Sequence, residues 1–358
     1  MKTANSSAIE NYVTSDICAM ATELLGKTVI SAERIGGQGN NRVYALQCGN
    51  AEKYLAKFYF QHPADKRDRL AVEFLSLSFL SSQGIENIPR PIAICPEKSC
   101  GIYEFIEGRK IAPSDISQKD IECAIDFISR LRNLNKTARD KNIAPASDAC
   151  FSIKAITASV EARLKRFDVL KEEAEEYREL DFFLRDDFKP FLTTLTEWAQ
   201  TQCQASGVSY AVEIPLEERT LSPSDFGFHN AIRTHDGGVV FLDFEYFGWD
   251  DPAKTTVDFL FHPAMALTEP LKKLFVRRML ETFSENKQLT DRVLMAYPLF
   301  GLKWCMIFLN EFIPNDFSRR AFASLNPLDQ SQLRRQQLLK AKNLFRELKE
   351  TYKEFPYG

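Results

Sequence analysis

Three polar residues in one short stretch have the types and the spacing that phosphoryl transfer needs. Asp225 is followed five positions later by Asn230, and the apolar run 239–242 leads into Asp243. We expect a loop to carry the first two and a paired strand to end at the third, because a polar turn separates the two segments. A carboxylate can orient an attacking hydroxyl and take its proton, while a carboxylate and an amide oxygen can hold Mg²⁺ against nucleotide phosphates. The alternative is that these residues only form turns, since Asp and Asn favour turns for local reasons.

Residues of a possible nucleotide site come earlier in the chain. The first group is a glycine-rich stretch that contains Gly36, Gly37, Gly39 and Asn41. Glycine lets the backbone approach phosphate oxygens and turn its N–H groups toward them, although an ordinary glycine-rich hairpin has the same composition. Lys57 lies inside the β-type run 53–60 with apolar neighbours on both sides. A buried ammonium there needs a partner or a ligand, whereas an outward-facing lysine would need neither.

Elements that position these residues follow from the hydrophobic pattern. A helical spacing of apolar residues over 8–25 predicts a leading helix. Three short β-type runs predict an antiparallel sheet: 28–35, 42–47 and 53–60. A second helix is expected to open near Pro63 and to end at Ser82, with Glu73 beside its apolar stripe. Helices are expected to dominate from 114 to 205 and from 270 to 352, and Asp251 followed by Pro252 is typical of a helix start.

The order of these features resembles the kinase-like fold of the aminoglycoside phosphotransferase and choline kinase superfamily. Residues 225–230 look like the catalytic loop, and 242–246 are similar to the choline kinase form of the metal motif. The resemblance implies an α+β, two-lobed fold. A small N-terminal nucleotide-binding lobe with an antiparallel sheet and a helix would span 1–106, and a larger, mostly helical C-terminal lobe would span 107–358.

The resemblance also implies roles for individual residues. Asp225 would be the catalytic base, and Asn230 and Asp243 would hold Mg²⁺. ATP would be bound by the glycine-rich stretch, by Lys57 paired with Glu73, and by backbone groups of Glu104 and Ile106 at a hinge between the lobes. The chain departs from the family pattern at Pro223, where relatives have a histidine, and Asp258 is carried over as a support for the catalytic loop.

Composition limits the partners and the location of the protein. The formal charge is -3, from 46 basic and 49 acidic residues, so no global field attracts nucleic acid. The eight cysteines form no C-x-x-C pair, and the N-terminus has no basic-then-apolar signal pattern, which favours the cytoplasm. The most apolar stretch, 297–313, contains Lys303, Asn310 and Glu311, so we expect a core helix and no membrane span.

The sequence therefore predicts an ATP- and Mg²⁺-dependent kinase that phosphorylates a hydroxyl group of a small metabolite, such as an amino alcohol, an aminoglycoside or a sugar. A catalytically inactive nucleotide-binding protein and a protein kinase are the alternatives. A protein kinase needs a long peptide-docking segment after the metal motif, and only residues 245–250 separate that motif from the next helix. The excess of acids over 171–187 is typical of a solvated helix face. The alternative is that these acids border the acceptor site, which favours a neutral or cationic acceptor. The oligomeric state stays open.

Overall fold

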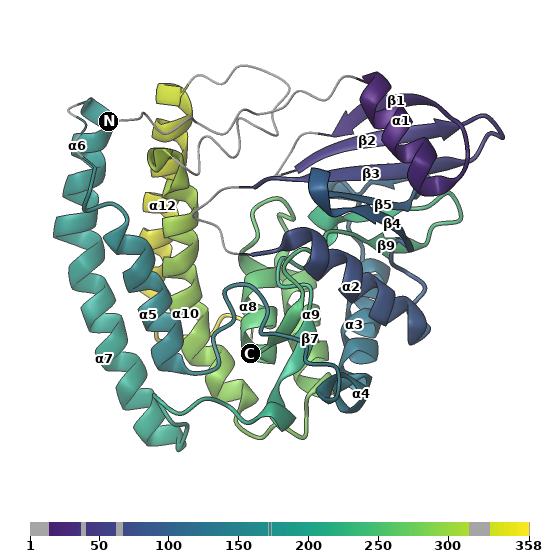
Figure 1. The fold of residues 1–358 in the computed structure, drawn as a ribbon. Helices are drawn as coiled ribbons and strands as arrows, with labels where there is room; N and C mark the ends of the chain where they lie inside the picture. The colour runs from purple at the N-terminus through teal and green to yellow at the C-terminus, as the bar shows by residue number, and fades with distance from the viewer. Residues whose placement is uncertain are drawn as a thin grey trace.

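The computed structural model describes residues 14–36, 41–61, 67–170, 172, 174–314 and 330–357. A five-stranded sheet with one helix on each face lies at one end, and helices make up most of the remainder (Figure 1). This arrangement confirms the predicted α+β, kinase-like fold class. The predictions for Gly37 and Gly39, and for the leading helix before Thr14, lie outside the described residues.

The sheet is antiparallel throughout, with the spatial order β1-β2-β3-β5-β4. Its strands are β1 (Val29–Gly36), β2 (Asn41–Cys48), β3 (Lys53–Tyr59), β4 (Pro91–Cys95) and β5 (Cys100–Glu104). The first three match the predicted β-type runs. Strand β4 was not predicted, and its alternating exposed side chains and initial proline fit an edge strand.

One helix covers each face of this sheet. Helix α1 (Thr14–Leu25) contributes Ile17 to a core shared with Phe58 and Ile102 of the sheet. Helix α2 (Arg69–Ser82) buries Leu77 in a second core that continues into the rest of the molecule. The two faces of the sheet therefore belong to different hydrophobic cores.

Helix α2 begins later than the sequence predicts. Residues 67 and 68 are not helical, and the Asp68 side chain accepts a hydrogen bond of 2.9 Å from the Ala71 N–H. That contact satisfies one of the N–H groups left free at a helix start, so Asp68 is the cap and the expected opening near Pro63 is wrong. The predicted end at Ser82 is correct.

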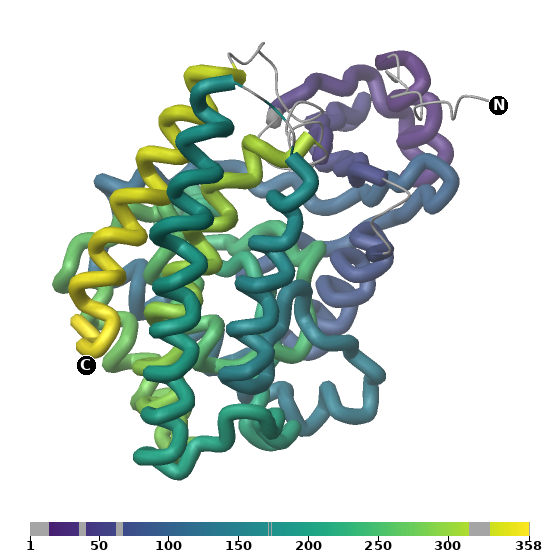
Figure 2. Tube along the Cα trace, turned by 90° about the vertical axis from the view of Figure 1, so that its left-hand side faces the viewer, coloured from purple at the N-terminus to yellow at the C-terminus, as the bar shows by residue number. Residues whose placement is uncertain are grey.

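Helices make up most of the described chain from residue 118 onward, as predicted. They are α3 (Gln118–Asn133), α4 (Asn135–Arg139), α5 (Ile153–Lys165), α6 (Glu175–Phe182), α7 (Lys189–Ser206), α8 (Pro252–Phe261), α9 (Glu269–Thr282), α10 (Leu289–Phe308) and α12 (Gln330–Thr351). A π-helical turn, Phe183–Phe188, joins α6 to α7. Helices α7 and α12 lie side by side (Figure 2), and the Phe345 ring of α12 packs edge-on against Phe191 of α7.

Helix α10 runs through the centre of this helical region. Together with the 3₁₀ turn Leu309–Phe312 it is long and apolar enough to cross a membrane, but 83% of its most apolar window is buried inside the protein. It packs against α5, α8 and α12. These contacts support the expected core helix.

Short strands flank the segments that carry Asp225, Asn230 and Asp243. They are β6 (Arg109–Lys110), β7 (Thr220–Ser222), β8 (Ala231–Arg233), β9 (Val239–Phe241) and β10 (Gly248–Asp250). Strands β8 and β9 form the predicted hairpin, and β10 pairs with β7. Helix α8 starts at Pro252, as predicted, because Asp251 accepts a hydrogen bond of 2.8 Å from the Ala253 N–H.

Candidate active site

The β8–β9 hairpin brings the predicted metal ligands together. Asn230 directly precedes β8, and its carbonyl oxygen accepts a hydrogen bond of 2.8 Å from the N–H of Leu242, next to Asp243. The Asn230 amide nitrogen lies 3.0 Å from the backbone oxygen of Asp225. Because the nitrogen is used in this way, the amide oxygen is the atom that Asn230 can offer to a cation.

Lys57 lies at the centre of a group of carboxylates. Its Nζ atom is 2.6 Å from Glu73 Oε2, 2.7 Å from Asp243 Oδ1 and 3.8 Å from Glu245 Oε2. The Lys57–Glu73 contact that the resemblance implies is therefore present. Tyr59 also donates a hydrogen bond of 2.7 Å to Glu73, which fixes that carboxylate from a second side. We call Glu73, Asp243 and Glu245 the carboxylate cluster.

The carboxylate cluster carries more negative charge than Lys57 neutralises. Burial raises the pKa of Asp243, and Glu245 and Glu73 add to this effect against the opposing influence of Lys57. Oxygen atoms of the three carboxylates lie within 4.8 Å of one another. Hard carboxylate and amide oxygens are the ligands that Mg²⁺ prefers, so this group of residues fits that ion.

Asp225 faces two histidines. His229 Nε2 lies 3.0 Å from Asp225 Oδ1, and His262 Nε2 lies 3.8 Å from the same oxygen. The two imidazole rings stack at 3.5 Å. Burial alone would raise the pKa of Asp225, but the hydrogen bond from His229, the charges of both histidines and the Asn230 amide together hold it well below its usual range. The carboxylate is therefore ionised and can accept a proton or a hydroxyl hydrogen bond.

The expected hinge lies at the end of β5. Glu104 is the last residue of the strand, and its N–H donates to the carbonyl of Arg90 at 2.9 Å. Its side chain is held by Arg90, whose Nε lies 3.0 Å from Glu104 Oε2. The backbone carbonyl of Glu104 is thus the group it could offer an adenine ring. Ile106 follows the strand and is half-buried, and the nucleotide roles of both residues stay predictions.

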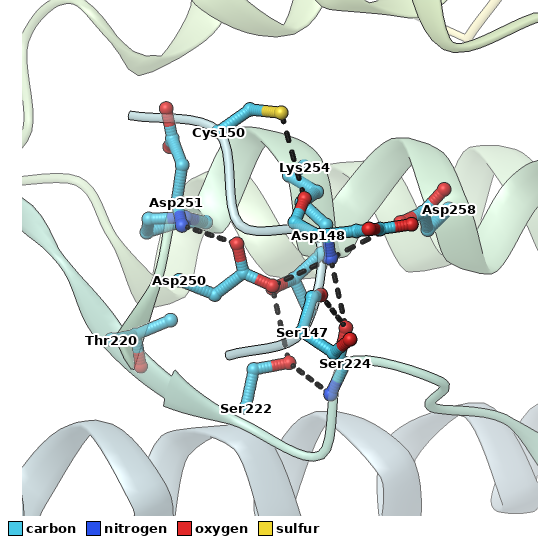
Figure 3. Close-up of polar contacts among 12 residues, drawn as sticks. Ser147, Asp148, Cys150, Thr220, Ser222, Ser224, Asp250, Asp251, Lys254 and Asp258 are labelled. Carbon is cyan, nitrogen blue, oxygen red and sulfur yellow. Dashed lines mark hydrogen bonds and ion pairs between the residues drawn. The ribbon is translucent and has the colours of Figure 1, made fainter. Parts of the chain in front are cut away.

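A cleft of about 680 Å³ opens beside Asp225. It lies between the loop that follows β7, the turn that precedes β10 and helices α5, α8, α10 and α12. Lys254 of α8 supports its floor: the ammonium contacts Asp250 Oδ2 at 2.6 Å, Asp258 Oδ2 at 3.2 Å and Ser224 Oγ at 3.2 Å (Figure 3). Ser224 immediately precedes Asp225 and also donates to the carbonyl of Ser147 at 2.8 Å. Asp258 therefore reaches the catalytic loop through Lys254.

The acidic segment does not border this cleft. None of its described acids over 172–187 is among the residues that line the cavity. Glu179 instead contacts Lys342 of α12 at 2.5 Å, and Glu175 lies 3.6 Å from Arg335 of the same helix. The expectation that these acids border the acceptor site and favour a neutral or cationic acceptor is wrong, because the described acids lie outside the cleft and several are paired with basic residues of α12 or with Arg185.

The sequence over residues 31–285 matches the family model described as the phosphotransferase enzyme family. The chain belongs to that family. No curated protein matches the sequence. The fold of this phosphotransferase is similar to that of a spectinomycin phosphotransferase solved with ADP and spectinomycin, with a TM-score of 0.62 at 10% identity over 96% of this chain and 100% of the other.

Two kinase structures are similar to the phosphotransferase in the same way. A choline kinase from Cryptosporidium parvum Iowa II has a TM-score of 0.58 at 14% identity, over 94% of this chain and 97% of its own. An ethanolamine kinase from Plasmodium vivax has a TM-score of 0.54 at 16% identity, over 88% and 84%. At these low identities, the TM-scores show a shared kinase-like fold.

Several residues at the site of this phosphotransferase were not predicted from the sequence. Glu245 is buried two positions after Asp243, and its Oε2 atom accepts a hydrogen bond of 2.6 Å from the Asn41 amide. Asn41 therefore ties β2 to the metal motif. A weak signal existed for Glu245 and His229, which lie close to predicted site residues in sequence. His262 had none, because only the fold brings it to Asp225.

Proposed function

We propose that this phosphotransferase transfers the γ-phosphate of ATP to a hydroxyl group of a small metabolite, with Mg²⁺. The observation that carries the proposal is the convergence of Asp225, Asn230, Asp243 and the Lys57–Glu73 pair from distant parts of the chain. Family membership supplies the class of reaction. Phosphoryl transfer depends mainly on positioning and on charge stabilisation, and these are the tasks such a set of side chains can perform.

Each side chain has a distinct task in the proposed reaction. Asp225 accepts a hydrogen bond from the acceptor hydroxyl, orients it toward the phosphate and takes its proton as the new bond forms. His229 holds Asp225 in position through its 3.0 Å contact. Lys57 aligns the α- and β-phosphates, and Glu73 fixes Lys57. When bound, Mg²⁺ on Asp243 and Asn230 would neutralise charge on the phosphates.

The alternatives explain the residues less well. A protein kinase needs a platform for a peptide, whereas Asp243 is separated from α8 only by a short turn and β10. A cleft of about 680 Å³ suits a small molecule. An inactive nucleotide-binding protein would need none of the proton-accepting geometry around Asp225. All eight cysteines are free thiols, and we infer a reducing compartment such as the cytoplasm.

Mg²⁺-dependent nucleotide binding is the first test. At a hundredfold excess over Kd, ATP with Mg²⁺ should stabilise the wild-type protein by about 2.7 kcal/mol, measured as a shift in thermal unfolding. ATP with a chelator should give a much smaller shift. Asp243→Asn should lose most of the Mg²⁺-dependent part, because the substitution removes a charged ligand.

The matched control is Asp126→Asn, on the exposed side of α3, where the carboxylate contacts only Arg130 among the described residues. It should behave as the wild type does. A wild-type protein that showed no shift with millimolar ATP or GTP and any of several divalent cations would contradict the proposed function.

A further inference from the structure

Basic side chains outnumber acidic ones around the cleft beside Asp225, which admits the phosphoryl acceptor in the proposed function. Among the described lining residues, six are Lys or Arg and three are Asp, and Asp250 just behind the lining pairs with Lys254, which leaves a smaller local surplus of positive charge. The whole chain has a formal charge of -3, so this surplus is a local feature. One of the three aspartates is Asp225, whose carboxylate faces the reacting hydroxyl in the proposed function.

The surplus is concentrated around Asp148, where two helices deliver a cation each. Arg163 of α5 donates to Asp148 Oδ2, and Lys303 of α10 lies 3.6 Å from the same oxygen. Burial would raise the pKa of Asp148, but the charges of Lys303, Arg163 and Lys254 outweigh it and hold that pKa well below its usual range. A single carboxylate thus serves several cations.

Lys303 is the least satisfied of these cations. Its side chain is 2% exposed, its ion-pair partner among the described residues is Asp148 at 3.6 Å, and the Phe300 ring lies 5.0 Å away. A separation of 3.6 Å is an ion pair too long for a hydrogen bond. A buried ammonium without hydrogen-bond acceptors is costly, so its donors are available to an anionic ligand in the cleft.

Lys303 is also close to the predicted catalytic base. Trp304, the next residue on α10, donates to Asp258 Oδ1 at 3.1 Å, and its ring packs edge-on against His262 at 5.2 Å. His262 in turn lies 3.8 Å from Asp225. Lys303 and Asp225 line the same cleft, so a small molecule there can contact both.

We propose that the acceptor carries, besides its reactive hydroxyl, an anionic carboxylate or phosphate group that binds to Lys303 and Arg163. This inference rests on the proposed function and names the substrate class of the same site. Lys340 of α12 and Arg166, the residue that follows α5, also line the cleft and add to its positive field. The hydroxyl end of such a molecule faces Asp225, and the anionic end is held away from the carboxylate cluster.

The test combines binding with turnover. Calorimetry should show binding of hydroxy acids such as glycerate, or of sugar phosphates such as ribose 5-phosphate, with and without a nonhydrolysable ATP analogue and Mg²⁺. The hydroxy-acid arm and the sugar-phosphate arm separate the two anionic groups. Glycerol, ribose and ethanolamine are matched neutral and cationic compounds. ADP release with ATP measures turnover on the same panel.

Variants assign the effect to the cation. Lys303→Met keeps the apolar stem and should weaken binding of the anionic compound about 10- to 100-fold, the range of a lost charge-assisted hydrogen bond, with the KM for ATP unchanged. Lys303→Arg should retain most of the affinity, and Arg163→Gln provides a second site if Lys303→Met does not fold. Lys342→Met, which contacts Glu179 outside the cleft, is the control and should change nothing.

Binding or turnover confined to neutral or cationic compounds would overturn the inference, as would no binding of any anionic compound. Anion binding equal in the wild type, Lys303→Met and Arg163→Gln would overturn it too. These results are distinct from failure of the proposed function, which would appear as a loss of Mg²⁺-dependent nucleotide binding while calorimetry could still detect the anion.

Discussion

Two ion clusters at the candidate active site have opposite imbalances. On the nucleotide side, the three acids of the carboxylate cluster face Lys57 and, at 3.8 Å from Glu245, Arg69. On the acceptor side, the single carboxylate of Asp148 faces Arg163 and Lys303 directly. The first cluster lacks positive charge, which a metal ion would supply, and the second lacks negative charge, which an anionic acceptor would supply. Buried charges that the chain does not balance indicate the ligand it is built to bind.

A third ion cluster shows what a balanced arrangement looks like. Arg292 of α10 is 2% exposed and bonds through all three guanidinium nitrogens: to Asp251 at 3.2 and 3.3 Å, to Glu218 at 3.1 Å and to Asn286 at 3.1 Å. Asp251 also caps α8. Because its donors are used within the protein, this cluster serves the fold and has nothing to offer a ligand.

The largest effect should come from the carboxylate between the two imbalanced clusters. Asp225→Asn removes the proton acceptor while keeping the size of the side chain, so kcat should fall roughly 10²- to 10⁴-fold. The Mg²⁺-dependent shift with ATP and the binding of the anionic compound should both persist. Steady-state kinetics together with calorimetry check the three quantities.

The control for Asp225→Asn is Asp126→Asn, which should retain wild-type turnover. If Asp225→Asn kept near wild-type kcat on the true acceptor, Asp225 would not be the base. If the Asp225→Asn variant lost nucleotide and acceptor binding as well, the effect of the substitution would be structural. The variant would then not support a catalytic role for Asp225.

The balanced cluster should affect stability. Arg292→Met leaves Asp251 and Glu218 without their buried cation, and the free energy of unfolding should fall by about 3 to 5 kcal/mol. Chemical denaturation measures the change. Arg277→Met, on the exposed face of α9, is the control and should stay within roughly 0.5 kcal/mol of the wild type. A loss as small as that of the control would mean that solvent already screens the Arg292 cluster.

The smallest predicted effect tests the acceptor-side cluster directly. Asp148→Asn removes the carboxylate that pairs with both Arg163 and Lys303, so the KM for an anionic acceptor should fall roughly fivefold, the equivalent of about 1 kcal/mol of screened charge interaction. The backbone φ of Asp148 is 58°, a conformation that asparagine tolerates well, so the fold should be kept.

The KM for ATP and for a neutral analogue should not change in Asp148→Asn. Asp181→Asn, an exposed residue that contacts Arg185, is the control. A higher KM for the anionic acceptor in Asp148→Asn would mean that Asp148 itself binds the acceptor, and the acceptor-side cluster would then need another explanation.

The sequence by itself determined the fold class and the order of the groups with chemical roles. Glycines, Lys57, Glu73, Asp225, Asn230 and Asp243 follow one another in the order that a kinase-like fold requires, and most helices and strands were predicted from local periodicity. Such features depend on residues that are close in sequence, so they can be predicted without knowledge of distant contacts. The start of α2 was wrong because a capping side chain decided it.

Only the tertiary structure decided the charge of the acceptor cleft and the surroundings of the base. The acids over 172–187 are abundant in the sequence, yet none of the described ones lines the cleft, and several pair with α12 or with Arg185. Arg163, Lys303 and Asp148 instead meet from α5, α10 and a connecting loop. His262 reaches Asp225 through the packing of α8, not through any spacing in the sequence. Electrostatic fields depend on distances in space, and a count of charges along a chain does not contain those distances.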